Sequence, residues 1–510
     1  MNLLDAVLLI PLAGFFMILA IPREREETIR RVALLVALIA FAASLALLWG
    51  FNRADPGFQH VSNLPWISAP EIRFHIGIDG VSLWLVLLTA LLTPICVLIS
   101  WRSINRRVKE FFALFLLMEF GLVGVFVSLD LFLFYVFWEV SLVPMYFLIG
   151  VWGHERRIYA AVKFFIYTMS GSVLMLAALI YLYNRAGTFD YGEILQLLSS
   201  GRLSLDRVEE GLLFLGFFVA FAIKVPLFPL HTWLPDAHVE APTAGSVMLA
   251  SVMLKMGCYG LVRFCLPLFP SASRALAPWI AVLAIVGILY GALVALVQPN
   301  MKKLVAYTSV SHLGFVVLGI FTFTQLGMNG AVYQMLNHGV STGALFVLVG
   351  YLYERKHSLE IEDYGGVATL APNLSAMFLI TALASMGLPM LNNFVGEYLV
   401  LQGVAQANFA WAVLAALGVI LAACYMLWLY QRVFFGEARP GAGMPDLGRR
   451  EWAAMLPLLV LMVWMGTLTQ SFMPPITASG ASILESTKVN VSFQVKASPP
   501  GRGTEVARAR

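Results

Sequence analysis

Charged residues are scarce in this chain. Only 12% of its 510 residues are Asp, Glu, Lys or Arg, whereas 60% are hydrophobic, and the mean hydropathy is +0.82. A water-soluble domain carries about twice that share of charge. The composition therefore excludes a soluble globule and predicts an all-α polytopic membrane protein, because helices satisfy their backbone groups within the bilayer.

Cysteine is also scarce, and no cofactor motif is present. Cys96, Cys258, Cys265 and Cys424 stand singly in apolar stretches, which excludes a disulfide framework and a cysteine-rich iron–sulfur site within this chain. No glycine-rich nucleotide loop follows a predicted strand. We therefore expect no flavin, nicotinamide, cluster or metal site here. The net charge of +4 is spread over loops without a basic run, so no nucleic-acid partner is expected.

Apolar runs of about 20 residues recur along the chain, and each is long enough to cross a hydrocarbon core of about 30 Å as a helix. The first run begins next to Met1 and ends at Pro22 without a small-residue cleavage site, so we expect a retained helix rather than a signal peptide. The predicted spans number about fourteen and lie at 3–21, 31–51, 77–101, 110–128, 131–151, 159–183, 211–230, 241–266, 276–297, 303–321, 327–353, 372–404, 410–435 and 451–473.

The basic residues predict an orientation. If the amino terminus lies on the outer side of the membrane, more than half of the 33 lysines and arginines fall in connections on its inner side. The positive-inside rule then places both termini outside. No soluble domain interrupts the spans, and residues 488–510 are expected to form a flexible tail.

Two predicted spans are interrupted by glycine and proline at comparable positions in the two halves of the chain. The first interruption contains Pro226 and Pro229, and the second contains Gly387 and Pro389. Proline removes a backbone donor, so nearby carbonyls need water, a side chain or an ion. Such pairs are typical of the discontinuous helices of transporters, although simple proline kinks would give the same pattern.

Four ionisable side chains lie inside predicted spans, where an unpaired charge costs about 3 kcal/mol or more. Lys224 precedes Pro226, Glu397 follows Pro389, and Glu139 and Lys255 are central in their spans. A purely structural Glu139–Lys224 ion pair is one interpretation. The number of such groups favours proton or ion translocation, entering near Glu139 and Lys224, passing Lys255 and leaving near Glu397.

Further polar candidates lie at similar depth. His312 and His338 are central in two later spans, His231 lies within the first interruption, and Glu119 is a further possible acid. A single intramembrane histidine often serves only as a hydrogen-bonding group between helices. Both interpretations therefore stay open for each of these residues.

Several motifs closely resemble those of one family. They are FWEV at 137–140, HTWLPDAHVEAPT at 231–243, LKMG at 254–257 and the paired broken helices. Over about residues 75–435 the chain resembles the antiporter-like membrane subunits of respiratory complex I, the NADH:quinone oxidoreductase. Within this family one subunit type carries glutamate at the second break, as Glu397 does here, whereas its siblings and related antiporters carry lysine.

The resemblance implies two inverted five-helix repeats, each with a discontinuous helix, at 110–266 and 276–435. Three helices precede them at 1–109, and one further helix at 451–473 precedes the tail at 488–510. It also implies roles for the ionisable residues in proton transfer. Glu139 would pair with Lys224, and Lys255 would be the central relay. His312 and His338 would connect Lys255 to Glu397, the last group of the chain. Asp79 matches a family string too, but as a residue at a helix start it could equally be a cap.

The resemblance further implies a bacterial inner-membrane subunit that translocates protons, driven by quinone reduction elsewhere in the complex. Flavin, iron–sulfur clusters and quinone would be in other subunits. Homologous antiporter-like subunits would lie on either side of this chain, and lipid, protons and water would be its other partners. Three alternatives remain open: a subunit of a cation/proton antiporter, the membrane part of an ion-pumping hydrogenase, and a structural scaffold.

Overall fold

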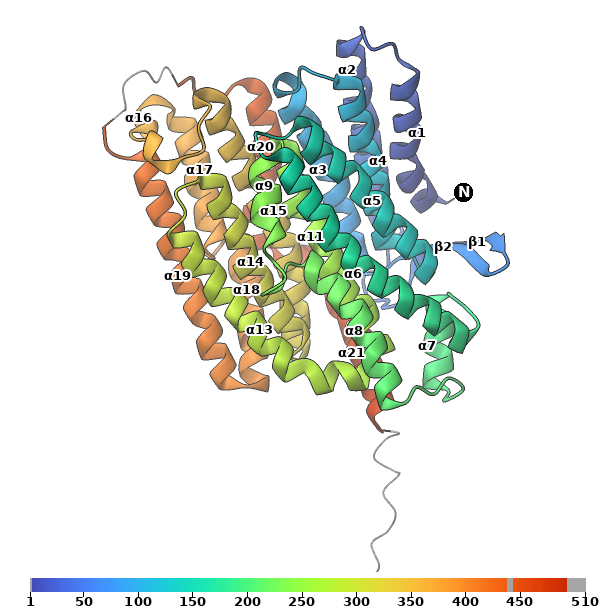
Figure 1. The fold of residues 1–510 in the computed structure, drawn as a ribbon. Helices are drawn as coiled ribbons and strands as arrows, with labels where there is room; N and C mark the ends of the chain where they lie inside the picture. The colour runs from blue at the N-terminus through green and yellow to red at the C-terminus, as the bar shows by residue number, and fades with distance from the viewer. Residues whose placement is uncertain (1, 438–443, 493–510) are drawn as a thin grey trace, which may run out of the picture.

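The computed structural model describes residues 2–437 and 444–492, and most of them are helical. The helices lie side by side in a tilted bundle (Figure 1). Eleven helical stretches in the described residues are long and apolar enough to cross a membrane. They are α1 (Leu3–Ala20), α2 (Glu26–Ala46) with its 3-10 extension, α3 (Ser82–Ser103), α4 (Val108–Val127), α5 (Leu131–Trp152), α6 (Arg157–Ala186), the run Thr243–Leu268, α13 (Pro270–Leu296), α14 (Met301–Ile320), α15 (Gln325–Lys356) and α19 (Phe409–Phe434).

The other three predicted spans take different forms. The span at 211–230 is α8 (Arg207–Lys224), followed after a break by α9 (Trp233–Glu240). The span at 372–404 is divided into α17 (Pro372–Ser385) and α18 (Asn392–Ala407), and the span at 451–473 is α20 (Arg449–Thr467). The interruptions predicted from proline and glycine are therefore present as gaps between helices.

Besides short turns such as α16 (Val367–Leu370), four longer elements were not anticipated. They are the antiparallel strands β1 (Gln59–Ser68) and β2 (Glu71–Ile78), the short helix α7 (Tyr191–Ser199) and the helix α21 (Met473–Ser492). The expected tail began at 488, but residues 488–492 belong to α21, and the rest of that segment lies outside the described residues. The predicted start of the third span at 77 is also too early, because β2 extends to Ile78 and α3 begins at Ser82.

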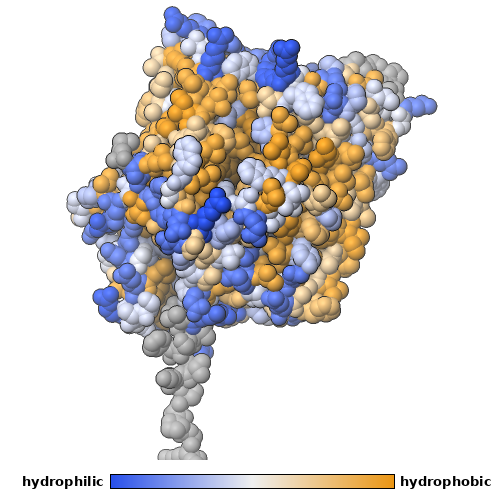
Figure 2. All heavy atoms as spheres, turned by 180° about the vertical axis from the view of Figure 1, so that it is seen from behind, coloured by the Kyte–Doolittle hydropathy of each residue, from blue (hydrophilic) through white to orange (hydrophobic). Residues whose placement is uncertain are grey.

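The bundle has two distinct ends. The α1–α2 connection, with Arg23 and Arg25, lies at one end, which we call the basic end; the β1–β2 hairpin and α7 lie toward the other, which we call the hairpin end (Figure 1). Between the ends the exterior is largely apolar, and many large hydrophobic side chains are exposed on α2, α6, α13 and α19. Figure 2 shows hydrophobic side chains over much of the middle of the molecule and hydrophilic ones gathered toward its ends. This surface suits a protein surrounded by lipid.

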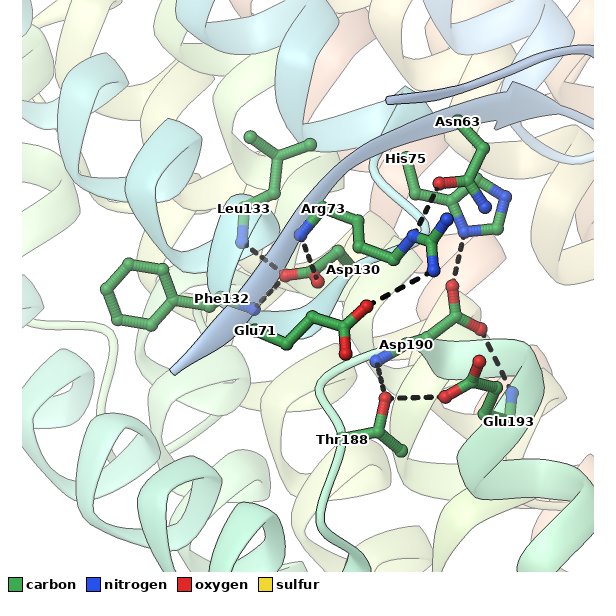
Figure 3. A network of polar contacts seen from close by, with 10 residues as sticks. All are labelled: Asn63, Glu71, Arg73, His75, Asp130, Phe132, Leu133, Thr188, Asp190 and Glu193. Atoms are coloured by element: carbon green, nitrogen blue, oxygen red, sulfur yellow. Dashed lines mark hydrogen bonds and ion pairs between the residues drawn. The ribbon is translucent and has the colours of Figure 1, made fainter. Parts of the chain in front are cut away.

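The hairpin is attached to the helices by buried carboxylates (Figure 3). Asp130 accepts a hydrogen bond from the Arg73 amide and caps α5, and Asp190 caps α7 while bonding Nδ1 of His75. Burial alone would raise the pKa of Asp190, but the hydrogen bonds from His75 and from the Glu193 amide outweigh it and hold the pKa below its usual value. An ionised Asp190 therefore joins β2 to α7.

The centre of the bundle is formed by α15 and by the run Thr243–Leu268, whose most apolar stretches are fully buried. This run consists of α10 (Thr243–Met248), α11 (Leu254–Gly260) and α12 (Leu266–Leu268), joined by π-helical turns at Leu249–Met253 and Leu261–Cys265. A π-turn shifts the helical register locally and is often found at functional sites. One of these turns directly precedes Lys255.

Candidate functional site

Four ionisable side chains form a continuous row inside the bundle. Lys255 Nζ lies 2.5 Å from Nδ1 of His338, and the His338 ring is 5.8 Å from the ring of His312, centroid to centroid. His312 Nδ1 in turn lies 2.8 Å from Oε1 of Glu397. All four side chains are buried. Each group of the row thus comes from a different helix: Lys255 from α11, His338 from α15, His312 from α14 and Glu397 from α18.

The second helix break shapes the Glu397 end of this row. The break brings Gly387 to φ +78°, a backbone conformation that favours glycine. A Cβ added at Gly387 would lie 3.3 Å from Oε2 of Glu397, so the break places the chain directly beside the carboxylate. The other oxygen, Oε1, also accepts a hydrogen bond from the side-chain amide of Gln334.

Neutral amides surround the same break, and the sequence analysis missed them. Asn392 donates to the carbonyl of Asn337, and Asn393 donates to the carbonyl of Ser385. The side-chain oxygens of Asn337, Asn392 and Ser385 have no hydrogen-bond partner among the described residues. The Asn-Asn pair within an apolar stretch was the available signal, because buried amides require partners.

Lys224 occupies a different environment. It ends α8 directly before the first break, and its ammonium faces the rings of Trp138 and Phe164, each at 5.4 Å from the centroid. Cation–π attraction replaces part of the hydration that burial removes. No direct contact joins Lys224 to Glu139: among the described residues neither Lys224 Nζ nor Oε1 of Glu139 has a hydrogen-bond partner, although Glu139 lies near enough for its charge to act on Lys224.

The two auxiliary candidates lie outside the row. Glu119 on α4 is fully buried, and neither of its carboxyl oxygens has a hydrogen-bond partner among the described residues. His231 lies in the break before α9, where its ring contacts the rings of Phe228 and Tyr290 and neither nitrogen has a partner. Unpartnered buried atoms of this kind indicate sites for water.

A buried ion pair lies at the hairpin end of the run Thr243–Leu268. Arg263, in the second π-turn, lies within 2.5 Å of Asp79, and both side chains are almost completely buried. Asp79 also caps α3 by accepting hydrogen bonds from the Val81 and Ser82 amides, so the cap interpretation is correct but incomplete. Arg263 was not among the predicted site residues, although a single arginine inside an apolar span indicates a buried charge that needs a partner.

Comparisons with known proteins agree with this geometry. Residues 128–423 match the family described as NADH:quinone oxidoreductase/Mrp antiporter, TM. The NADH-quinone oxidoreductase subunit M of Rickettsia prowazekii is 45% identical over 444 residues, which cover 87% of this chain and 90% of that protein. The same subunit of Rhodobacter capsulatus is 44% identical, with 91% and 93% covered.

Two solved structures have a similar fold. One chain in the structure of respiratory complex I from Thermus thermophilus with bound NADH is 35% identical, with a TM-score of 0.85, and the match covers 94% of this chain and 99% of that one. A chain of the Mrp complex from Dietzia has a TM-score of 0.83 at 22% identity and shows the fold alone.

Proposed function

The chain belongs to the NADH:quinone oxidoreductase and Mrp antiporter family, and from that premise we propose that it is a proton-translocating membrane-arm subunit of NADH:quinone oxidoreductase. The row Lys255–His338–His312–Glu397 is the single observation that carries this proposal. Each of these groups can bind and release a proton, and imidazole does so from two nitrogens. Buried ionisable groups in series are typical of membrane proton relays.

Within this proposal, Lys224 and Glu139 form the coupling element. Because they are not in contact here, a movement that brings Glu139 toward Lys224 would favour the charged lysine, and the reverse movement would favour proton release. One pKa unit corresponds to about 1.36 kcal/mol. Moving one charge across 100 mV costs about 2.3 kcal/mol, so a shift of about two units would suffice for one proton.

The topology is also part of the proposal. We infer fourteen spans arranged as two inverted five-helix repeats, with α8–α9 and α17–α18 as their discontinuous helices. The basic end would face the cytoplasm of a bacterial inner membrane, and both termini would lie on the periplasmic side. Flavin, iron–sulfur clusters and quinone would belong to other subunits, and homologous antiporter-like subunits would flank this chain.

The test is a Lys255→Ala variant in the assembled complex, reconstituted into vesicles. Formation of a proton gradient during NADH oxidation should fall to background, because the row loses its first group. The NADH:ferricyanide activity, which reports assembly, should stay unchanged. Lys109→Ala serves as the control, since this lysine lies at the basic end outside the row.

Two outcomes would contradict the proposal. If the Lys255→Ala complex pumps protons normally, the buried charges have only the structural role of a scaffold. Cation/proton exchange by vesicles that contain this chain but lack the redox subunits would favour the antiporter alternative instead.

A further inference from the structure

An apolar groove lies between α2, α3, α15 and α20. Its volume is about 360 Å³, and every residue that lines it has an apolar side chain or a tryptophan ring. The rim of the groove consists of exposed side chains of α2 and α20, which are Leu45, Val460 and Trp464. The floor consists of buried side chains of α3 and α15, which are Leu88, Leu336 and Val340. The groove therefore opens to the exterior of the bundle and reaches its innermost helix.

The lining of the groove determines what can fill it. Water occupies a cavity only where it finds about two to four polar partners. The two indole N–H groups of the lining are already used, because Trp84 donates to the Phe472 carbonyl and Trp464 donates to the Ser471 hydroxyl. An apolar cavity stays dry and binds apolar ligands, and an empty one leaves its lining without packing partners. We therefore expect hydrocarbon in the groove.

Lipid is the source of hydrocarbon that the surface of the bundle provides. The rim of the groove is continuous with large hydrophobic side chains that are exposed on α2 and α20, such as Leu38 and Val463. This exterior suits contact with the acyl chains of a bilayer. A chain that lies against α2 or α20 thus meets the open side of the groove without crossing any polar surface.

The length of the groove matches one leaflet. Its lining runs from Phe41 to Leu48 on α2 and from Pro457 to Trp464 on α20, which is about 10 Å along each helix. One leaflet contributes about 15 Å of hydrocarbon. Trp84 and Trp464 mark the end of the groove that lies toward the hairpin end, and tryptophan is enriched at the level of lipid headgroups. A chain from the leaflet at the hairpin end would therefore enter beside these tryptophans.

The floor of the groove is the back of the helix that carries His338. Leu336 and Val340 are four residues apart on one face of α15, and His338, midway between them, points to the opposite face. Leu88 packs against the next residue, since a Cβ added at Gly339 would lie 2.5 Å from Leu88 Cδ2. A ligand in the groove thus supports α15 from the side opposite the row.

We propose that the groove is a binding site for one acyl chain of a membrane phospholipid from the leaflet at the hairpin end. The chain begins beside Trp84 and Trp464 and ends near Phe41, with Leu88 and Val340 beneath it. Binding forms no covalent bond. The site does not depend on proton transfer, so it goes beyond the proposed function and can be tested without measuring pumping.

The experiment uses the assembled complex in vesicles of phosphatidylethanolamine and phosphatidylglycerol. A fraction of the phospholipid carries a photoreactive diazirine in one acyl chain, and labelled residues are identified by mass spectrometry after illumination. We expect label on Leu88 and Val340, although both side chains are buried. A diazirine close to the headgroup should label Trp84, and one close to the chain end should label Phe41.

A substitution that fills the groove should displace the chain. Leu461 of α20 lines the groove and is half-buried. In Leu461→Trp the indole takes the place of two or three methylene groups, so labelling of Leu88 and Val340 should fall at least about tenfold. Val463→Trp is the matched control, because Val463 is exposed on the same helix and does not line the groove. Its labelling should equal that of the wild type.

A second pair of variants fills the groove from its other wall. Leu45→Trp on α2 should also lower labelling of the floor at least about tenfold. Leu38→Trp, exposed on the same helix two turns earlier and outside the lining, should leave it unchanged. The NADH:ferricyanide activity reports assembly of each variant, so a variant that does not assemble is replaced by the one on the opposite wall.

Three results would overturn the site. The first is an absence of label on Leu88 and Val340 in the wild-type complex, and the second is full labelling in assembled Leu461→Trp and Leu45→Trp. The third is loss of label when a quinone with an isoprenoid tail is added at constant phospholipid, which would assign the groove to that tail. Label on Phe41 from the diazirine close to the headgroup would place the lipid in the opposite leaflet and contradict the proposed orientation.

The site and the proposed function fail independently. Normal pumping by Lys255→Ala would overturn proton translocation and leave the labelling results unchanged. Unlabelled Leu88 and Val340, with pumping lost in Lys255→Ala, would overturn the lipid site and leave the relay intact.

Discussion

The contacts of His338 and His312 constrain where their protons reside. When Lys255 is protonated, Nδ1 of His338 accepts from its ammonium, and a neutral His338 then carries its proton on Nε2. Nδ1 of His312 faces the Glu397 carboxylate and must donate. With Nδ1 of His312 donating to Glu397, its Nε2 accepts from the Tyr425 hydroxyl at 3.2 Å. A proton accepted by His338 from Lys255 can leave from its other nitrogen.

The Arg263–Asp79 pair makes a prediction about stability. Arg263→Met leaves the Asp79 carboxylate buried without its counter-ion, which should destabilise the fold by about 3–5 kcal/mol. The double variant Arg263→Met/Asp79→Asn removes both charges, retains a side-chain oxygen to cap α3, and should recover most of the loss. Thermal unfolding of the purified complex measures both. Equal losses in the single and double variants would show that the charges are not coupled.

At the residue scale, ionisable groups could be predicted because they are conspicuous in apolar sequence. Lys255, His312, His338 and Glu397 were all identified in this way, and the resemblance implied the order from Lys255 through the histidines to Glu397. The atoms that meet could not be predicted, because they depend on how four helices pack. For the same reason a direct Glu139–Lys224 contact could not be predicted; in the described structure Lys224 Nζ and Oε1 of Glu139 are not hydrogen-bonded, and the functional pairing of the two residues stays a prediction. Neutral groups such as the Asn337 and Asn392 amides were missed, because an uncharged polar side chain is less conspicuous in an apolar span than a charged one.

Close contact between α15 and α18 positions Glu397. A Cβ added at Gly330 of α15 would lie 2.5 Å from the Val400 amide nitrogen and 2.9 Å from the Gly396 carbonyl. Small residues at such positions let two helix backbones approach closely within a membrane. Because Gly396 precedes Glu397, this contact holds the carboxylate against His312.

Gly330→Ala should therefore affect both stability and pumping. The added methyl group must displace α18, at a cost of about 1–3 kcal/mol for overpacking, and should draw Glu397 away from His312. Gly211→Ala on α8 is the matched control, because a Cβ there meets no atom within 4 Å. Thermal unfolding and gradient formation would test both variants. An unchanged melting temperature in Gly330→Ala would contradict the proposed close contact.

The connection between α5 and α6 predicts a pH dependence. Burial, and then the nearby charge of Lys302, lower the pKa of His154 from 6.5 to about 4. The unfolded chain thus takes up this proton at a higher pH than the folded chain, so the folded state loses stability as the pH falls from about 6.5 to about 4. His154→Gln should flatten this part of the stability profile. Thermal unfolding across that pH range measures it, and identical profiles would exclude the contribution.

At the element scale, membrane helices and their interruptions followed from hydropathy, proline and glycine, which are local signals. The β1–β2 hairpin could not be predicted in this way. Strand β1 is mostly exposed and contains Pro65. The attachment of the hairpin depends on Asp130 and Asp190, which are distant in sequence. The helix α21 was missed because its composition is more polar than that of the other spans.

At the scale of the whole molecule, the row joins the two halves of the chain. Lys255 comes from the run that ends the first proposed repeat, whereas His312, His338 and Glu397 come from the second. The contact between Lys255 and His338 is therefore the link in the row that joins the two halves, and it lies on α15, whose most apolar stretch is fully buried. Each broken helix has an ionisable group beside it, Lys224 at one and Glu397 at the other.

A relay in series makes a prediction that independent sites do not. If every proton passes both imidazoles, His312→Gln and His338→Gln should each lower the rate of gradient formation by about 100-fold or more, the usual effect of losing a proton-transferring group. The double variant should then be no slower than the slower single variant, because residues that act as a unit are not additive. Glutamine retains hydrogen-bonding capacity but does not titrate near neutral pH. If the loss of rate in the double variant is instead the product of the two single losses, that result would indicate two parallel routes through the bundle.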